Sequence, residues 1–327
     1  MKSVTKAVVS TEELSVLIQN AFPGCAVTEI RELTEGMFNR AYYICGSGAL
    51  ADGAILKIGP REGTKLLTYE KDILRTEVAA YRLLEGKSVP VPQVLFADYG
   101  RTLIPCDYFF MSYIPGVLWK DADAEKLQRS RPKLMEQLGR IHAEIHSVVG
   151  PHFGYPKEVP GFRYDSWPEA FLGMMGDVCR DGIADGHVLP YEAILGAAAR
   201  HRETLAAVTV PRLVDFDLWA GNAILGEEAD EYTIRGIIDF ERCFFGDPYG
   251  DFVSAVMVFD DVQKEPDFLK GYGTAVADDE GFRIRTNLYR LYLSVIMYVE
   301  TYRYEEDYAR YMKEQLRGRI EKLLAEL

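Results

Sequence analysis

Cysteine is scarce in this sequence. Among 327 residues there are five cysteines, which are scattered and never form a CxxC pair: Cys25, Cys45, Cys106, Cys179 and Cys243. An odd, dispersed set favours neither a disulfide framework nor a zinc site. Long apolar runs are also missing, and Met1–Ser10 lacks the apolar stretch of a signal peptide. The sequence therefore predicts a cytoplasmic protein with no membrane partner.

Positive charge is in deficit. Lysine and arginine total 37 against 50 aspartates and glutamates, which gives a formal net charge of −13. This balance argues against a nucleic-acid partner, because nucleic-acid-binding proteins usually concentrate basic residues. It is compatible with a cationic small molecule, although acidity alone also keeps a protein in solution. Hydrophobic residues make up 48% of the chain, enough to bury the core of one large domain or two moderate ones.

The first third of the chain shows one helix pattern, then strand patterns, then a second helix pattern. Ser10 and Glu13 have capping-box spacing ahead of a periodic apolar stretch, which predicts a helix over Thr11–Phe22. Helical periodicity that stops at Gly86 predicts a second helix over Tyr69–Leu84. Short apolar or alternating segments predict strands at Val27–Leu33, Ala41–Cys45, Ala54–Ile58, Gln93–Ala97 and Asp107–Tyr113. The first three of these strands suggest an antiparallel meander.

The segment Ile114–Gly116 interrupts regular structure with Pro115 and Gly116, so we place a boundary there between two lobes, 1–114 and 115–327. After it the patterns are mainly helical, with a hairpin-like island at Leu213–Leu225 and Ile234–Phe240. The expected helices are Ala122–Val148, Trp167–Gly176, Tyr191–Ala206, Tyr249–Phe259, Phe282–Tyr302 and a last one through Leu316 and Leu327.

The island carries the residues with the clearest chemistry. Asp217 and Asn222 stand at DxxxxN spacing, and Asp239 follows the apolar pair Ile237 and Ile238. In the kinase mechanism an aspartate at the first position accepts the proton of the attacking hydroxyl, while the asparagine and the later aspartate bind magnesium. Fixed cations are needed because phosphoryl transfer spreads negative charge over the transferred group. The spacing predicts Asp217 as the catalytic residue and Asn222 and Asp239 as ligands of Mg2+.

A kinase site also needs a cation that holds the nucleotide phosphates and a carboxylate that holds this cation. Lys57 lies in the predicted strand Ala54–Ile58, and Glu77 lies on the next predicted helix. An ion pair between these two side chains is sterically reasonable and matches the lysine–glutamate pair of kinases. Their order along the chain makes the five residues a constellation, which is a stronger signal than any single motif.

With these residues in place, the sequence resembles the aminoglycoside phosphotransferase and choline kinase-like small-molecule kinases over most of its length. The likeness includes the turn Leu33–Asn39, the segment Phe110–Gly116, the stretch Leu138–His142 and both acidic motifs. It implies an α+β, two-lobed protein-kinase-like fold, with an antiparallel sheet lobe and a larger helical lobe. It also implies that Asp247 and Asp251 have structural roles.

The resemblance implies the ligands of the site as well. Beside Lys57 and Glu77, the expected nucleotide-binding residues are in the turn and in the inter-lobe segment: Gly36, Asn39, Met111 and Tyr113. The co-substrate is ATP or GTP with Mg2+, and the acceptor is the hydroxyl of a small molecule such as an aminoglycoside or another cationic compound. The resemblance fixes neither the acceptor nor the oligomeric state.

One position departs from the family pattern. The family usually has histidine two residues before the catalytic aspartate, and this chain has Asp215. Two close carboxylates raise the pKa of one of them unless a cation compensates. This departure leaves two alternatives open: a pseudokinase that binds nucleotide without turnover, or a phosphatase that uses Asp215 and Asp217 as a DxD pair and forms an aspartyl-phosphate.

Overall fold

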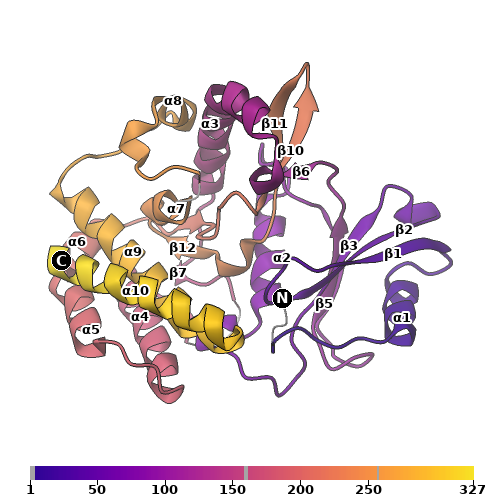
Figure 1. Cartoon of the computed structure of the whole chain (residues 1–327), viewed down its shortest axis with the longest axis horizontal. Helices are drawn as coiled ribbons and strands as arrows, with labels where there is room; N and C mark the ends of the chain where they lie inside the picture. Colours follow the sequence, from indigo (N-terminus) through magenta and orange to yellow (C-terminus); the bar gives the residue numbers. More distant parts are fainter. Residues whose placement is uncertain (1–3, 158–160, 256–257) are drawn as a thin grey trace.

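Two lobes are visible in the computed structural model (Figure 1), which describes residues 4–157, 161–255 and 258–327. The smaller lobe is built on a five-stranded antiparallel sheet with strand order β1-β2-β3-β5-β4. Its elements are α1 (Thr11–Ala21), β1 (Val27–Leu33), β2 (Arg40–Gly46), β3 (Ala54–Ile58), α2 (Ile73–Leu84), β4 (Val94–Asp98) and β5 (Tyr108–Ser112). The predicted antiparallel sheet with one main helix is confirmed. The first three strands form the predicted meander, whereas β3 pairs with β5 and β4 lies at the edge.

The two faces of this sheet pack against different helices. Ile44, Leu56 and Phe110 belong to a small core that also contains Leu17 and Ile18 of α1. The opposite face belongs to the main core and packs toward α2. Because successive side chains of a strand alternate between faces, Lys57 in β3 is on the α2 side.

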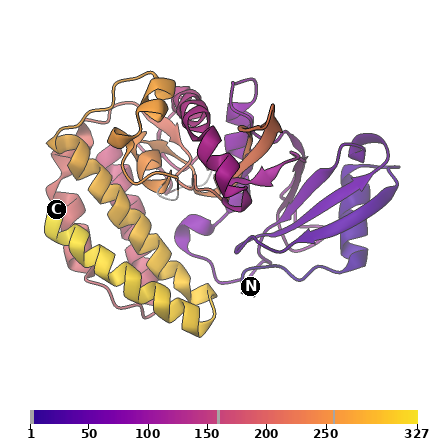
Figure 2. The same ribbon diagram turned by 45° about the horizontal axis from the view of Figure 1, so that its top comes forward.

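The larger lobe is mainly helical, and Figure 2 shows α9 and α10 lying side by side along its outer edge. Its helices are α3 (Ala124–Ser147), α4 (Trp167–Ala184), α5 (Tyr191–Arg200), α6 (Arg202–Ala206), α7 (Tyr249–Ser254), α8 (Pro266–Tyr272), α9 (Glu280–Val299) and α10 (Glu306–Glu326). The helix predicted at Tyr249–Phe259 includes residues 256 and 257, which are outside the described residues. None of the described helices has the length and apolarity needed to span a membrane.

Short strands surround the island predicted at Leu213–Leu225 and Ile234–Phe240. β10 (Ala223–Glu228) and β11 (Glu231–Ile237) form a hairpin, and β6 (Val117–Leu118) pairs with β10. The start of the predicted island is different: β9 (Arg212–Val214) pairs with β12 (Phe244–Gly246) in a second small sheet that also contains β7 (Phe153–Gly154) and β8 (Arg163–Tyr164). Both motifs therefore lie in connections between these two sheets: Asp217 and Asn222 between β9 and β10, and Asp239 between β11 and β12.

Several predicted helix bounds were wrong in detail. The periodic stretch from Tyr69 begins with a short 3-10 turn, η2 (Thr68–Glu70), and α2 starts only at Ile73. The predicted helix Tyr191–Ala206 divides near His201, and α8 was not predicted. Helix α4 continues well past Gly176 to Ala184. Tertiary packing determines where these helices begin and end, and the local periodicity of the sequence does not contain this information.

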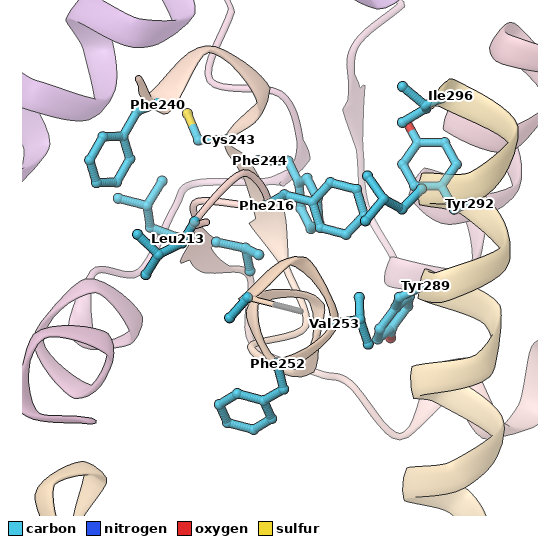
Figure 3. Packing of buried hydrophobic residues seen from close by; sticks show 14 of the residues in the cluster. Leu213, Phe216, Phe240, Cys243, Phe244, Phe252, Val253, Tyr289, Tyr292 and Ile296 are labelled. Atoms are coloured by element: carbon cyan, nitrogen blue, oxygen red, sulfur yellow. The ribbon is translucent and has the colours of Figure 1, made fainter. Parts of the chain in front are cut away.

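An aromatic core lies behind the catalytic loop (Figure 3). Phe216 packs between Phe244 and Tyr292, with ring centroids 5.1 and 5.7 Å away. Its backbone adopts the left-handed region, with φ of 60°, which is uncommon for an aromatic residue. This buried ring fixes the start of the loop that presents Asp217.

Helices α3 and α8 approach each other through two glycines. A Cβ atom at Gly139 would lie 2.1 Å from the carbonyl oxygen of Phe268, and one at Gly271 would lie 1.9 Å from that of Glu136. Only glycine allows this backbone contact. The contact places α8 against the helix that supports the catalytic loop.

Candidate active site

The loop that carries Asp217 follows β9, and Asp251 of α7 holds its backbone. The carboxylate of Asp251 accepts backbone N–H groups of Phe216 at 2.7 Å and Asp215 at 3.2 Å. His146 of α3 is 2.9 Å away through its Nε2 atom. These donors lower the pKa of the Asp251 carboxyl against the opposing effect of burial. Asp251 therefore acts as a buried anion that shapes the loop.

Asp217 is partly exposed, with 20% of its side chain accessible. Asn222 donates its amide N–H to the Asp217 carbonyl oxygen at 2.9 Å, which closes the loop on itself. Arg242 donates to Asp217 Oδ1 at 3.3 Å. Burial raises the pKa of Asp217 to about 7, although Arg242 opposes the shift. Asp217 therefore has the raised basicity that a proton acceptor needs.

Lys57 meets both of its expected partners. Its Nζ atom is 2.7 and 2.9 Å from the two carboxylate oxygens of Glu77, and 2.6 Å from Oδ1 of Asp239. Burial alone would lower the pKa of this ammonium, but Asp239 and Glu77 outweigh it and raise the pKa above its ordinary value. The ammonium of Lys57 thus connects the sheet lobe to Asp239 of the larger lobe.

Tyr81 of α2 strengthens this junction from the protein interior. Its hydroxyl donates to Glu77 at 2.8 Å and accepts the backbone N–H of Asp239 at 3.0 Å. Asp239 itself has a left-handed backbone, with φ of 73°. A non-glycine residue in this region is uncommon and points to a constrained site.

Glu241 is a functional candidate that the motif search missed. Oxygen atoms of Glu77, Asp239 and Glu241 lie within 4.8 Å of one another, and the ammonium of Lys57 is the cation that Glu77 and Asp239 contact. Asn39 of the turn donates its amide N–H to Glu241 at 2.9 Å. The signal was present in the sequence, because Glu241 and Arg242 are charged residues inside the apolar run from Ile237 to Phe245.

The other residues expected to bind nucleotide lie in β5, just after it, and in the turn between β1 and β2. Met111 is buried in β5 and pairs with Ile55 of β3, so it shares the sheet face of Lys57. Tyr113 packs its ring 4.8 Å from that of Tyr43. Gly36 is exposed in the turn. Asn39 is the residue of this group that reaches the acidic motif.

Asp215 is completely enclosed. Its side chain has no exposed area, and within the described residues neither carboxylate oxygen has a hydrogen-bond partner. Burial, followed by the charges of Asp251 and Asp217, raises the pKa of Asp215 well above its ordinary value. The interior therefore disfavours the charged form of Asp215.

The fold and the site together define a kinase-like enzyme with two lobes. Comparison with protein families gives a match to the phosphotransferase enzyme family over residues 29–284. The chain belongs to this family, whose members transfer phosphoryl groups. The predicted two-lobed fold and the predicted family are confirmed.

Similar proteins support the same fold. A protein assigned as a fructosamine-3-kinase from Thermobifida fusca has a TM-score of 0.68 and 16% identity, over 97% of this chain and 100% of that one. Aminoglycoside phosphotransferase APH(4)-Ia, in a ternary complex with AMP-PNP and hygromycin B, has a TM-score of 0.64 and 16% identity, over 95% and 97%. Mouse acyl-CoA dehydrogenase family member 10 is 23% identical over 71% of this chain, which spans only 20% of that protein.

Proposed function

We propose that the protein is a small-molecule kinase that transfers the γ-phosphoryl group of ATP or GTP to a hydroxyl of a small acceptor. The observation that carries this proposal is the contact of Lys57 with both Glu77 and Asp239. In kinases this lysine–glutamate pair must be in place for activity. Nucleotide complexes of proteins with the same fold support a nucleotide co-substrate.

Two residues suit a magnesium ion. Asp239 offers a carboxylate with 32% of its side chain exposed, and Asn222 uses its amide nitrogen on Asp217, so its amide oxygen is the atom suited to a metal. Oxygen ligands of this kind match Mg2+. Bound there with the nucleotide, Mg2+ would neutralise the charge that develops on the transferred group.

Asp217 takes the role of proton acceptor. With its pKa raised to about 7 by burial, its carboxylate can take the proton of an acceptor hydroxyl near neutral pH. Arg242 donates to one oxygen of this carboxylate at 3.3 Å and the Asn222 amide donates to the other at 3.4 Å, so both contacts hold the carboxylate in place. Lys57 serves to hold the nucleotide phosphates through its ammonium.

The burial of Asp215 bears on the two alternative functions. A phosphatase would need this carboxylate to attack phosphorus, and its side chain has no exposed area. A pseudokinase would follow from a disordered catalytic loop, but Asp251 holds the loop through two backbone N–H groups. Both observations favour an active kinase.

A panel of acceptors with MgATP and MgGTP tests the proposal. The panel contains aminoglycosides first, because the chain has a net charge of −13, followed by amino alcohols, sugars and fructosamines. We expect nucleoside diphosphate release together with an acceptor whose mass has increased by one phosphoryl group. Binding of MgATP without turnover on any acceptor would favour the pseudokinase, and a trapped aspartyl-phosphate would favour the phosphatase.

A further inference from the structure

Glu300 is a buried carboxylate between the two halves of the candidate site. It begins the 3-10 turn η7 (Glu300–Arg303) after α9, and it is only 2% exposed. Its two oxygens accept the Arg242 guanidinium at 2.9 and 3.0 Å, and one of them also accepts the hydroxyl of Tyr69. Arg303 is 3.5 Å away. With these donors in contact, Glu300 is a structural anion rather than a recognition group for the acceptor.

One branch from Glu300 leads to the catalytic aspartate. Arg242 is held by both oxygens of Glu300 and reaches Oδ1 of Asp217 at 3.3 Å. One guanidinium nitrogen, Nη2, donates to both Glu300 oxygens, and the other, Nη1, donates to Asp217. The planar group therefore spans the two carboxylates and has little freedom to turn. The position of Glu300 therefore sets where Arg242, and with it the Asp217 carboxylate, can lie.

The other branch leads to the start of α2. Tyr69 lies in η2, a few residues before α2, and Glu77 is one turn into that helix. Arg303 pairs with Glu70 next to Tyr69. Lys157 donates to the carbonyl oxygens of Tyr69 and, at 2.6 Å, of Lys71. These contacts tie the beginning of α2 to the larger lobe.

The turn Leu33–Asn39 also contacts η7. The guanidinium of Arg303 lies 5.1 Å from the ring centroid of Phe38, and Phe38 is next to Asn39, which reaches Glu241. Cation–ring contacts of this kind are favourable when the pair is shielded from water. Residues of η7 thus contact this turn, the segment just before α2, and Arg242.

We propose that Glu300 is a positioning residue that couples the two halves of the active site. Through Arg242 it orients Asp217, and through Tyr69 it holds the start of α2, so that Glu77 stays on Lys57. The catalytic meaning of this coupling rests on the proposed kinase function. The coupling itself is a property of the fold, and hydrogen exchange can measure it without an acceptor.

Two variants separate the branches. Glu300→Gln removes the negative charge that both Arg242 and Tyr69 contact. Tyr69→Phe removes only the hydroxyl that connects the segment before α2 to Glu300. Each has a control of the same chemistry at an exposed position on α10: Glu314→Gln and Tyr311→Phe. Because Glu300→Gln leaves two buried arginines with less compensation and can impair folding, Tyr69→Phe keeps the proposal testable.

The first measurement is hydrogen exchange of the full chain, followed in peptides that cover residues 65–84 and 213–225. We expect Glu300→Gln to speed exchange in both peptides by about tenfold, which is the loss of one charged hydrogen bond. Tyr69→Phe speeds exchange only in residues 65–84, and neither control changes either peptide. Unchanged exchange at 65–84 in both Glu300→Gln and Tyr69→Phe would overturn the proposal.

The second measurement is turnover with the acceptor found in the panel. Misplacing Asp217 slows the chemical step, so Glu300→Gln should lower kcat on the order of 10- to 100-fold. The same variant loosens the start of α2 and with it the Glu77–Lys57 pair, so KM for MgATP should rise as well. A rise in KM with unchanged kcat would contradict the positioning role. If the wild-type protein turns over no acceptor, the proposed function fails, and the exchange experiment still decides the role of Glu300.

Discussion

Replacing Asp215 by asparagine removes an ionisable group from a place that cannot accommodate its charge. The Asp215 side chain has no exposed area, and both oxygens are without partners among the described residues. Burial first, and then the neighbouring carboxylates, raise the pKa of this group in the folded state. Asparagine has nearly the same shape and no charge. We expect Asp215→Asn to stabilise the protein at neutral pH.

The gain has a definite pH dependence. Above the ordinary aspartate pKa of 3.8 the unfolded chain loses this proton while the folded protein keeps it. Wild-type stability therefore falls as pH rises, by about 1.4 kcal/mol per pH unit, until pH passes the raised folded-state pKa. Asp215→Asn lacks this loss, so its stability advantage over the wild type should grow as pH rises from 5 to 7.

Urea unfolding at pH 5, 6, 7 and 8 measures this difference in the free energy of unfolding. Asp52→Asn, at an exposed position, controls for the loss of one negative charge from the chain. A stability difference between Asp215→Asn and wild type that stays constant from pH 5 to 7 would refute the argument that Asp215 is a neutral buried acid.

Four further substitutions test separate parts of the account. Lys57→Met should lower kcat/KM for MgATP on the order of 100-fold or more in steady-state assays, because the phosphates lose their cation. Gly139→Ala should cost at least about 2 kcal/mol in urea unfolding, because α3 and α8 must separate, whereas Gly318→Ala, with open space around it, should gain roughly 0.5–1 kcal/mol. Ser10→Ala should cost about 1 kcal/mol by the same assay, because it removes the cap on the Glu13 N–H.

Much of the fold could be predicted from local sequence patterns. The capping box of Ser10 and Glu13 marks the start of α1, and the alternation in β3 gives the face on which Lys57 lies. Asp217, Asn222 and Asp239 could be singled out because their spacing is short and their residue types match one chemistry. Lys57 and Glu77 could be added because their order along the chain restricts where they can meet.

The long-range contacts could not be predicted in the same way. Glu300 follows Asp217 by 83 positions in the chain, and nothing in its neighbourhood marks it as a partner of Arg242. The cross-lobe contacts of Tyr69 and Lys157 depend on how two lobes pack, which no local period encodes. The burial of Asp215 is also a tertiary property, because the sequence alone shows only two aspartates close together.

The central claim is that Asp217 accepts the proton of an acceptor hydroxyl in a phosphoryl transfer. The most direct test compares the wild-type protein with Asp217→Asn in the acceptor assay with MgATP, and measures MgATP affinity of both. We predict that MgATP affinity stays within about twofold, and that turnover falls by roughly 10²- to 10⁴-fold because asparagine cannot take the proton. Turnover of the acceptor by Asp217→Asn at the wild-type rate would contradict the account.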